Sequence, residues 1–195
     1  IRDRCGAIIE GDPPHACPVC GVLSVEFEGF GPFYSSTAEH LGQLKPVEII
    51  NILEGIPDEV EALIANISPA ILQKKPSANE WSIAEIVGHI LETDILFSDR
   101  ARTLLKKQGT ELPLPMAPWK LHEGKGYESM QSTELVTHMR AAREQSLDLI
   151  RALTPEDWIR RGLNFGSKTS MLDLGTWLAN HDRGHLAQIK RLCEV

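Results

Sequence analysis

The chain has 195 residues, of which 42% are hydrophobic and 24% are charged, and its formal net charge is −7. This length supports one core of moderate size with a small appendage. Lysines and arginines occur singly or in pairs, so the sequence lacks the basic stripe that binds phosphates, and we expect no nucleic acid partner. No apolar run approaches the roughly 18–20 residues of a membrane span, and no signal pattern opens the sequence. We therefore expect no membrane association and a cytoplasmic location.

The first 30 residues are rich in Gly and Pro and hold three of the four Cys of the chain. Short stretches in which apolar and polar residues alternate indicate small strands between loops. Cys17 and Cys20 are separated by two residues and followed by Gly21, a spacing in which two thiolates grip one metal ion around a tight turn. Four Cys are too few for a disulfide scaffold, so the clustering favours metal binding. We expect a metal ribbon over residues 1–30.

A linker and a helical unit follow the ribbon. Residues 31–45 begin with Gly and Ser and indicate a linker, whereas residues 46–195 carry apolar residues at the three- and four-residue spacing of helices. The first helix is expected from about residue 46 to residue 67, with an interruption at residues 55–57, because proline is costly inside a helix. We expect this unit to fold without the ribbon.

The second helix begins at a capping box, in which Ser82 is followed three residues later by Glu85, and it runs to about Lys107. A Pro-rich connection over residues 110–131 comes next. Connections of that length in compact domains are usually functional or mobile.

Two further helices complete the expected unit. One spans about residues 132–153, and the last spans about residues 171–193. A loop that contains Trp158, Gly162 and Gly166 is expected between them. Four helices with one long connection predict a four-helix bundle, so the fold class is mainly α with a small N-terminal β unit.

Histidines interrupt the expected core stripe of the last helix. Two histidines four residues apart project from one side of a helix, one turn apart, which suits the binding of a single metal ion. His89 lies beside the apolar stripe of the second helix, so adjacent helices would complete a set of three nitrogens with open positions for water or substrate. Buried histidines with hydrogen-bond partners are the alternative. The stripe consists of Leu174, Leu178, His181, His185, Ile189 and Leu192.

The stretches NEWSIAEIVGHILE, LTPEDW and LDLGTWLANHDRGHLAQIKRL resemble the DinB-like (YfiT-like) metalloenzyme superfamily over about residues 57–193. The resemblance implies a four-helix bundle with a three-histidine metal site. Characterised relatives include thiol-dependent S-transferases and a thiol-dependent isomerase, so the family does not fix a substrate. By motif, the resemblance implies His89, His181 and His185 as ligands, and we interpret Trp81, Trp158 and Gln188 as packing or supporting residues.

The N-terminal Cys pattern, together with the following VLSVEFEGF, resembles the rubredoxin-like ribbon of rubrerythrins, which carries two C-x-x-C-G knuckles. Arg2 stands where the first knuckle would have its other Cys. A fourth ligand upstream of the first residue, a strained substitution by His15, and a ribbon that has lost its metal all stay open. The resemblance implies zinc or iron at Cys5, Cys17 and Cys20.

Two functional hypotheses result. In the first, a divalent Zn, Ni or Fe ion at the three-histidine site activates a low-molecular-weight thiol for S-transfer, or activates water in a hydrolytic variant. In the second, the protein is not an enzyme, the ribbon serves redox or structural purposes, and the histidines sense metal. The expected partner is a small-molecule substrate, a homodimer stays open, and no catalytic side chain is assigned.

Other polar residues receive less specific expectations. No His has a Glu three residues before it, so the sequence disfavours a di-iron carboxylate site. We expect His122 and Glu123 to be exposed loop residues and His138 to be partly solvated. Cys193 is expected to be a small buried apolar residue. Asp182, beside a candidate ligand, is expected to point away from the site.

Overall fold

The computed structural model describes residues 16, 43–77, 80–113, 124–164 and 167–194. Except for residue 16, the ribbon predicted over residues 1–30, with Cys5, Cys17 and Cys20, lies outside the described residues. The predicted linker is described only from residue 43 onward. The ribbon and the domain boundaries therefore stay predictions.

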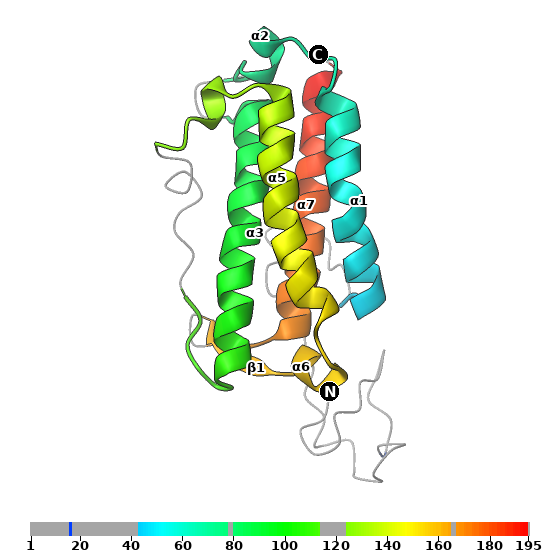
Figure 1. Cartoon of the computed structure of the whole chain (residues 1–195), viewed down its shortest axis with the longest axis vertical. Coiled ribbons are helices and arrows are strands. Elements are labelled where there is room, and N and C mark those ends of the chain that lie inside the picture. Colours follow the sequence, from blue (N-terminus) through cyan, green and yellow to red (C-terminus); the bar gives the residue numbers. More distant parts are fainter. Residues whose placement is uncertain (1–15, 17–42, 78–79, 114–123, 165–166, 195) are drawn as a thin grey trace.

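Four long helices pack into an elongated bundle, which confirms the predicted helical fold class (Figure 1). They are α1 (Pro46–Ile64), α3 (Ile83–Lys106), α5 (Ser132–Arg151) and α7 (Met171–Cys193). α3 packs against α5 and α7, and α1 packs against the same two helices. No described helix is long and apolar enough to cross a membrane.

The helices α3 and α5 run in the same direction, and α1 and α7 run in the opposite one (Figure 1). The end of α3 and the start of α5 therefore lie at opposite ends of the bundle, so the chain between Lys106 and Ser132 has to span its length. This arrangement agrees with the single long connection that the sequence predicts. Two short helices, α2 (Pro69–Leu72) and η2 (Tyr127–Ser129), lie near the end at which α3 begins.

Capping boxes fix the starts of the two helices that carry the candidate ligands. At α3, the backbone N–H of Glu85 donates to Ser82 Oγ at 3.2 Å, and the N–H of Ser82 donates to Glu85 Oε2 at 2.8 Å. At α7, Ser170 and Asp173 make the same reciprocal pair. Each box satisfies N–H groups that have no partner within the helix. The first box was predicted from the sequence.

The predicted interruption of the first helix is wrong, because α1 is continuous through Pro57. A proline inside a helix has no N–H, so the carbonyl oxygen four residues earlier receives no helical hydrogen bond. That carbonyl belongs to Leu53, and it accepts a hydrogen bond from Arg143 Nη1 at 3.4 Å instead. A side chain from α5 thus compensates for the missing helical bond.

The predicted loop before the last helix contains regular structure that the sequence analysis missed. It holds a short helix, α6 (Pro155–Trp158), and an antiparallel pair, β1 (Arg161–Asn164) and β2 (Ser167–Ser170). The Leu163 N–H donates to Thr110 O at 2.8 Å, so the segment after α3 lies beside β1. A Cβ at Gly162 would lie 2.8 Å from the Thr110 carbonyl oxygen, which explains the glycine there.

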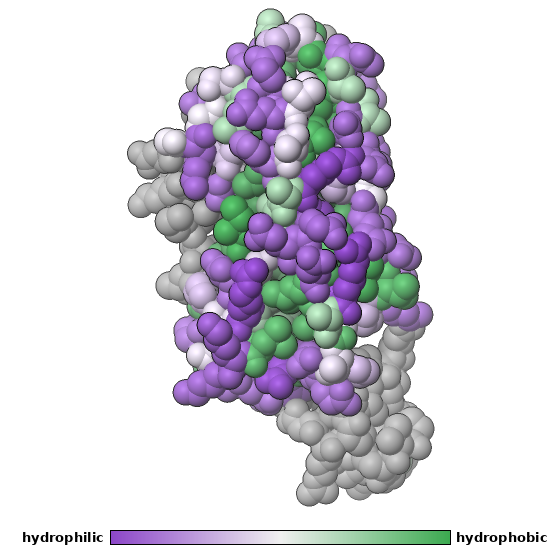
Figure 2. All heavy atoms as spheres, viewed as in Figure 1, coloured by the Kyte–Doolittle hydropathy of each residue, from purple (hydrophilic) through white to green (hydrophobic). Residues whose placement is uncertain are grey.

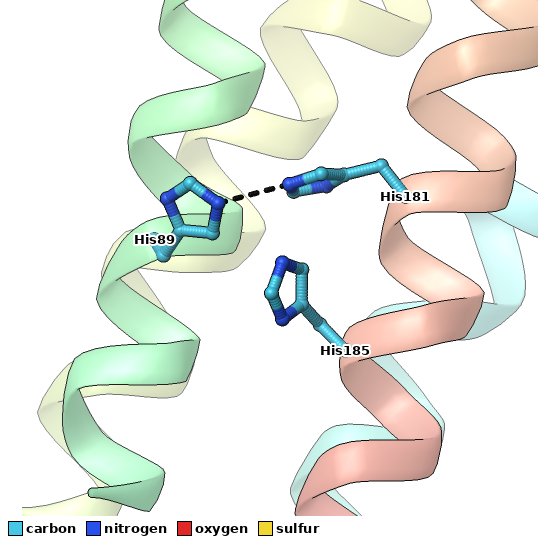
Figure 3. Close-up of side chains that lie close together, drawn as sticks. All are labelled: His89, His181 and His185. Carbon is cyan, nitrogen blue, oxygen red and sulfur yellow. Dashed lines mark hydrogen bonds between the residues drawn. The ribbon is translucent and has the colours of Figure 1, made fainter. Parts of the chain in front are cut away.

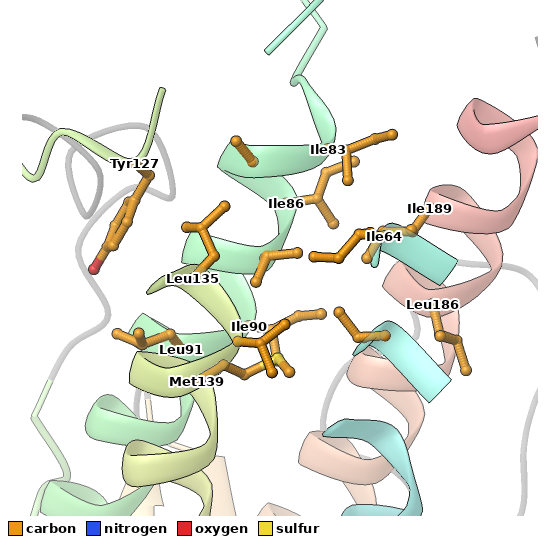
Figure 4. Packing of buried hydrophobic residues seen from close by; sticks show 14 of the residues in the cluster. Ile64, Ile83, Ile86, Ile90, Leu91, Tyr127, Leu135, Met139, Leu186 and Ile189 are labelled. Atoms are coloured by element: carbon orange, nitrogen blue, oxygen red, sulfur yellow. The ribbon is translucent and has the colours of Figure 1, made fainter. Parts of the chain in front are cut away.

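Buried apolar side chains form two clusters, one in each half of the bundle. One cluster includes Ile64, Ile90 and Met139 (Figure 4), and the other includes Phe97 and Leu178. Along α3, α5 and α7, the residues between the clusters include three buried charged groups, which we call the charged layer: Asp94, Arg143 and Asp182. On the face in Figure 2, hydrophilic side chains predominate, and hydrophobic ones form small groups among them.

Gly88 marks a close contact between α3 and Tyr127. A Cβ at this glycine would lie 2.4 Å from Tyr127 Cδ2, so the ring rests directly on the helix backbone. We expect Gly88→Ala to lower the free energy of unfolding by about 1–3 kcal/mol through overpacking. Gly55→Ala in α1, where a Cβ meets nothing within 4 Å, should raise it by roughly 0.5–1 kcal/mol. Urea unfolding of both variants measures the contrast, and equal effects would contradict it.

Candidate metal centre

Three histidine side chains from two helices converge in the space between α3 and α7 (Figure 3). His89 comes from α3, and His181 and His185 come from successive turns of α7. Each offers a ring nitrogen, and these nitrogens all lie within 4.8 Å of one another. The structure therefore brings together the three histidines that the sequence analysis singled out.

The histidines of α7 lie at the edge of the core rather than in it. His181 and His185 are half-buried, whereas Asp182 and Leu186 beside them are buried, so the core stripe predicted through the two histidines is wrong by one residue. The stripe turns gradually around a helix because 3.6 residues form one turn. His89 is buried, with 6% of its surface exposed. This placement leaves the cluster partly open to solvent on its α7 side.

Side-chain oxygens orient the two rings of α7. His181 Nδ1 and Asp182 Oδ1 are 2.9 Å apart, and His185 Nδ1 and Gln188 Oε1 are 3.0 Å apart. When an Nδ1–H donates to such an oxygen, the Nε2 atom of that ring keeps its lone pair for a ligand. The expectation that Asp182 points away from the site is wrong, because its carboxylate turns back along the helix to the ring before it.

The donor set fits a divalent ion. His181 Nε2 and His89 Nε2 are 2.9 Å apart, so in this arrangement one of them carries a shared proton. Two nitrogens that bind one tetrahedral zinc ion lie roughly 3.3 Å apart, so a small ring movement would accommodate the ion. Binding would displace the shared proton. Neutral imidazoles at this spacing suit zinc, nickel and iron.

Two indole rings flank the cluster. The ring centroid of Trp81 lies 4.7 Å from that of His89, and the centroid of Trp177 lies 5.2 Å from that of His181. Both indoles are half-buried, so they form apolar walls beside the candidate ligands. Trp81 was interpreted from the sequence as a packing or supporting residue, whereas Trp177 was missed. Trp158 is buried in the other cluster, away from the histidines.

The charged layer adjoins the site and was also missed. Arg143 from α5 forms ion pairs with Asp94 of α3, at 2.9 Å, and with Asp182 of α7. All three residues are at most 1% exposed. The signal was available, because Asp94 and Arg143 stand where the apolar stripes of α3 and α5 call for hydrophobic residues.

Burial raises the pKa of Asp94 from 3.8 to about 7, and the nearby Asp182 carboxylate also raises it while Arg143 opposes the shift. The folded state therefore keeps a proton that the unfolded state releases between these values. The Asp94 carboxyl therefore makes its full contribution to the free energy of unfolding below its ordinary pKa of 3.8, and this contribution is lost as the pH rises through about 7.

We expect the metal-free protein to lose stability relative to Asp94→Asn as the pH rises from about 5 to 8, because asparagine cannot ionise. Urea unfolding of both proteins with a chelator present, across that pH range, measures the difference. Parallel pH profiles would contradict the expectation.

The remaining candidates lie away from the cluster. His138 is exposed on α5, in agreement with its expected solvation. Cys193 is half-buried, and its Sγ lies 3.9 Å from the Leu63 carbonyl oxygen, so it is less buried than expected. His122 and Glu123 lie outside the described residues.

Comparisons with known proteins agree with this architecture. A family model described as the DinB superfamily matches residues 52–189, a range that contains all three histidines. The uncharacterised protein YuaE of Bacillus subtilis (strain 168) is 25% identical over 162 aligned residues, which cover 76% of this chain and 92% of that protein.

Two solved structures share the fold. YfiT from Bacillus subtilis, described as a probable metal-dependent hydrolase with an unusual four-helix bundle topology, has a TM-score of 0.65 at 15% identity and covers 83% of this chain and 95% of its own. An uncharacterised protein from Escherichia coli UTI89 has a TM-score of 0.56 at 13% identity, with 76% of this chain and 92% of that chain covered. At these identities, the likeness concerns the fold alone.

Proposed function

Because this chain belongs to the DinB superfamily, we propose that it is a metal-dependent enzyme that holds one divalent ion on His89, His181 and His185. The observation that carries the proposal is the convergence of three imidazole nitrogens from α3 and α7 within 4.8 Å. Three protein ligands leave at least one coordination position open, which is the arrangement of catalytic rather than structural sites.

The residues of the chain prepare the site. Asp182 and Gln188 fix the ring orientations of the two histidines on α7, and they hold the Nε2 atoms toward the ligand position. Trp81 and Trp177 limit the access of bulk water at the flanks. A divalent ion bound there would supply Lewis acidity and lower the pKa of a water molecule or thiol at the open position.

We propose hydrolysis as the first reaction class to test. The support is the fold shared with YfiT, which is described as a probable metal-dependent hydrolase. Thiol-dependent S-transfer, which the family resemblance implies, stays a prediction, because no feature among the described residues selects a thiol over water. The zinc, iron or nickel identity of the ion and a small-molecule substrate are likewise proposals.

Metal content and turnover test the proposal together. Protein purified without added metal is analysed for bound metals, alongside the triple variant H89A/H181A/H185A and the control His138→Ala. Cys17→Ser with Cys20→Ser separates any contribution of the predicted ribbon. We expect the triple change to remove one ion per chain and the exposed His138 control to keep it. Ester, amide and phosphoester substrates are then assayed with zinc, nickel and iron, with and without a small thiol.

The outcomes separate the alternatives. Failure of the wild-type protein to bind any divalent ion, or equal binding by the triple variant, would contradict the metal site. Turnover that requires both metal and thiol would replace hydrolysis by thiol transfer. Stoichiometric metal without turnover across the panel would favour a sensing role.

A further inference from the structure

We propose that Arg143 is a positioning residue for the metal centre: it holds Asp182, which in turn fixes the ring of His181, and it is itself anchored by the carbonyl that Pro57 leaves without a helical donor. This inference rests on the metal site proposed above. It adds a residue from α5 and a residue from α1 to a centre whose ligands come only from α3 and α7.

The first step is the contact between Arg143 and Asp182. The guanidinium Nη2 pairs with Asp182 Oδ2, while the other oxygen of the same carboxylate, Oδ1, lies 2.9 Å from His181 Nδ1. The carboxylate is therefore held at both oxygens, by the arginine on one side and by the imidazole on the other. Its rotation would break one of two charge-assisted bonds.

The second step is the anchoring of Arg143 itself. Its Nε and Nη2 atoms lie 3.1 and 2.9 Å from Asp94 Oδ2, and its Nη1 atom donates to Leu53 O at 3.4 Å. The guanidinium thus reaches all three other long helices from α5. An ordinary residue at position 57 would present an N–H to the same Leu53 carbonyl, whereas Pro57 has none. The proline keeps that acceptor available for the arginine.

The third step concerns charge. The Asp182 carboxylate is buried, pairs with the Arg143 guanidinium, and lies against the His181 ring. A carboxylate that accepts the Nδ1–H of a ligating histidine raises the basicity of the Nε2 atom of that ring. Asp182 would therefore strengthen the binding of a cation at Nε2 as well as fix the ring orientation.

Replacing Arg143 by lysine separates a role in holding the bundle together from a role in positioning His181. Lysine keeps the positive charge, but a single ammonium group cannot reproduce the planar fork that bonds two carboxylates and a carbonyl. If Arg143 serves only to hold the bundle together, its replacement should lower the free energy of unfolding and leave the affinity of the three histidines for a metal ion unchanged. If it positions His181, metal affinity should fall in protein that remains folded.

The experiment titrates the full-length protein with cobalt(II), which reports coordination through its visible spectrum, and measures thermal unfolding of each metal-free variant. The variants are Arg143→Lys, Pro57→Ala and the control Ser146→Ala. Ser146 Oγ lies 3.1 Å from Ser98 Oγ and donates to Asp94 O at 3.2 Å, so it occupies the same buried region without bonding Asp182.

We expect Arg143→Lys to weaken cobalt binding by roughly 10- to 100-fold, the range known for residues that orient metal ligands. Pro57→Ala, which keeps every charge but supplies a competing N–H to Leu53 O, should weaken cobalt binding by a smaller factor and alter the cobalt spectrum. Ser146→Ala should lower the unfolding temperature and leave cobalt affinity unchanged.

Cobalt binding by both Arg143→Lys and Pro57→Ala within about twofold of wild type would overturn the inference while the proposed metal site stands. An equal loss of affinity in Ser146→Ala would also overturn it, because the loss would then follow from any damage to the buried region. If wild-type protein binds no cobalt, zinc, nickel or iron(II), the proposed function itself fails. Should Arg143→Lys not fold, the comparison of Pro57→Ala with Ser146→Ala decides alone.

Discussion

Replacing His181 by alanine should lower the affinity for zinc by roughly 100- to 1,000-fold. Apparent binding energies of four-ligand zinc sites are about 10–16 kcal/mol, so one ligand carries roughly 2.5–4 kcal/mol. The metal-free variant should remain folded, because the side chain of His181 is partly exposed and lies at the edge of the core. Competition titration with a zinc indicator measures the loss.

His138→Ala is the matched control for this measurement. The replaced residue is also a histidine on a long helix, but it is exposed on α5 and outside the cluster. Its removal should leave zinc affinity unchanged. Zinc binding that is equally tight in His181→Ala and wild type would show that the ion binds elsewhere in the chain.

Replacing Ile90 by alanine should lower the free energy of unfolding by about 2–5 kcal/mol. The side chain is fully buried in the cluster shown in Figure 4, so its removal leaves a cavity and loses apolar contact. Folded domains have free energies of unfolding of only about 5–15 kcal/mol, so this single change would remove a large part of the stability of the bundle.

Ile95→Ala provides a control on the same helix with the same chemical change. Ile95 is 45% exposed, so its truncation should shift stability by no more than about 0.5 kcal/mol. Urea unfolding of the two variants at one pH gives the comparison. Similar losses for both would mean that α3 is packed differently from the arrangement described above.

Much of the bundle could be predicted from the sequence because local signals mark it. The Ser82 capping box predicted the start of α3. The spacing of apolar residues predicted the first and last residues of α7. Both signals are local, since they depend on residues within one or two turns of each other.

The features that were missed depend on contacts between distant residues. The Leu53 carbonyl that Pro57 leaves without a helical donor accepts a hydrogen bond from Arg143, which lies 86 positions beyond the proline in the chain. The pair β1 and β2 is supported by the segment after α3, through the bond from Leu163 to Thr110. Nothing within a local window of sequence reports such partners.

The candidate site was predicted at the level of its histidines but not of their surroundings. Spacing and family resemblance singled out the three rings, whereas the direction of the Asp182 carboxylate could not be read from its neighbours. A side chain adjacent to a ligand on a helix ordinarily projects about 100° away from it. Here the buried Arg143 and the ring of His181 together determine its orientation.

The charged layer also bears on how the helices find their alignment. Two purely apolar halves would tolerate a helix that slides by one turn, because one aliphatic side chain can replace another. With the layer present, such a slide would bury a guanidinium or a carboxylate against aliphatic carbon, at a cost of several kcal/mol. We therefore expect the charged layer to disfavour compact but misaligned states during folding. The alignment observed in the structure also places His89 beside the two histidines of α7.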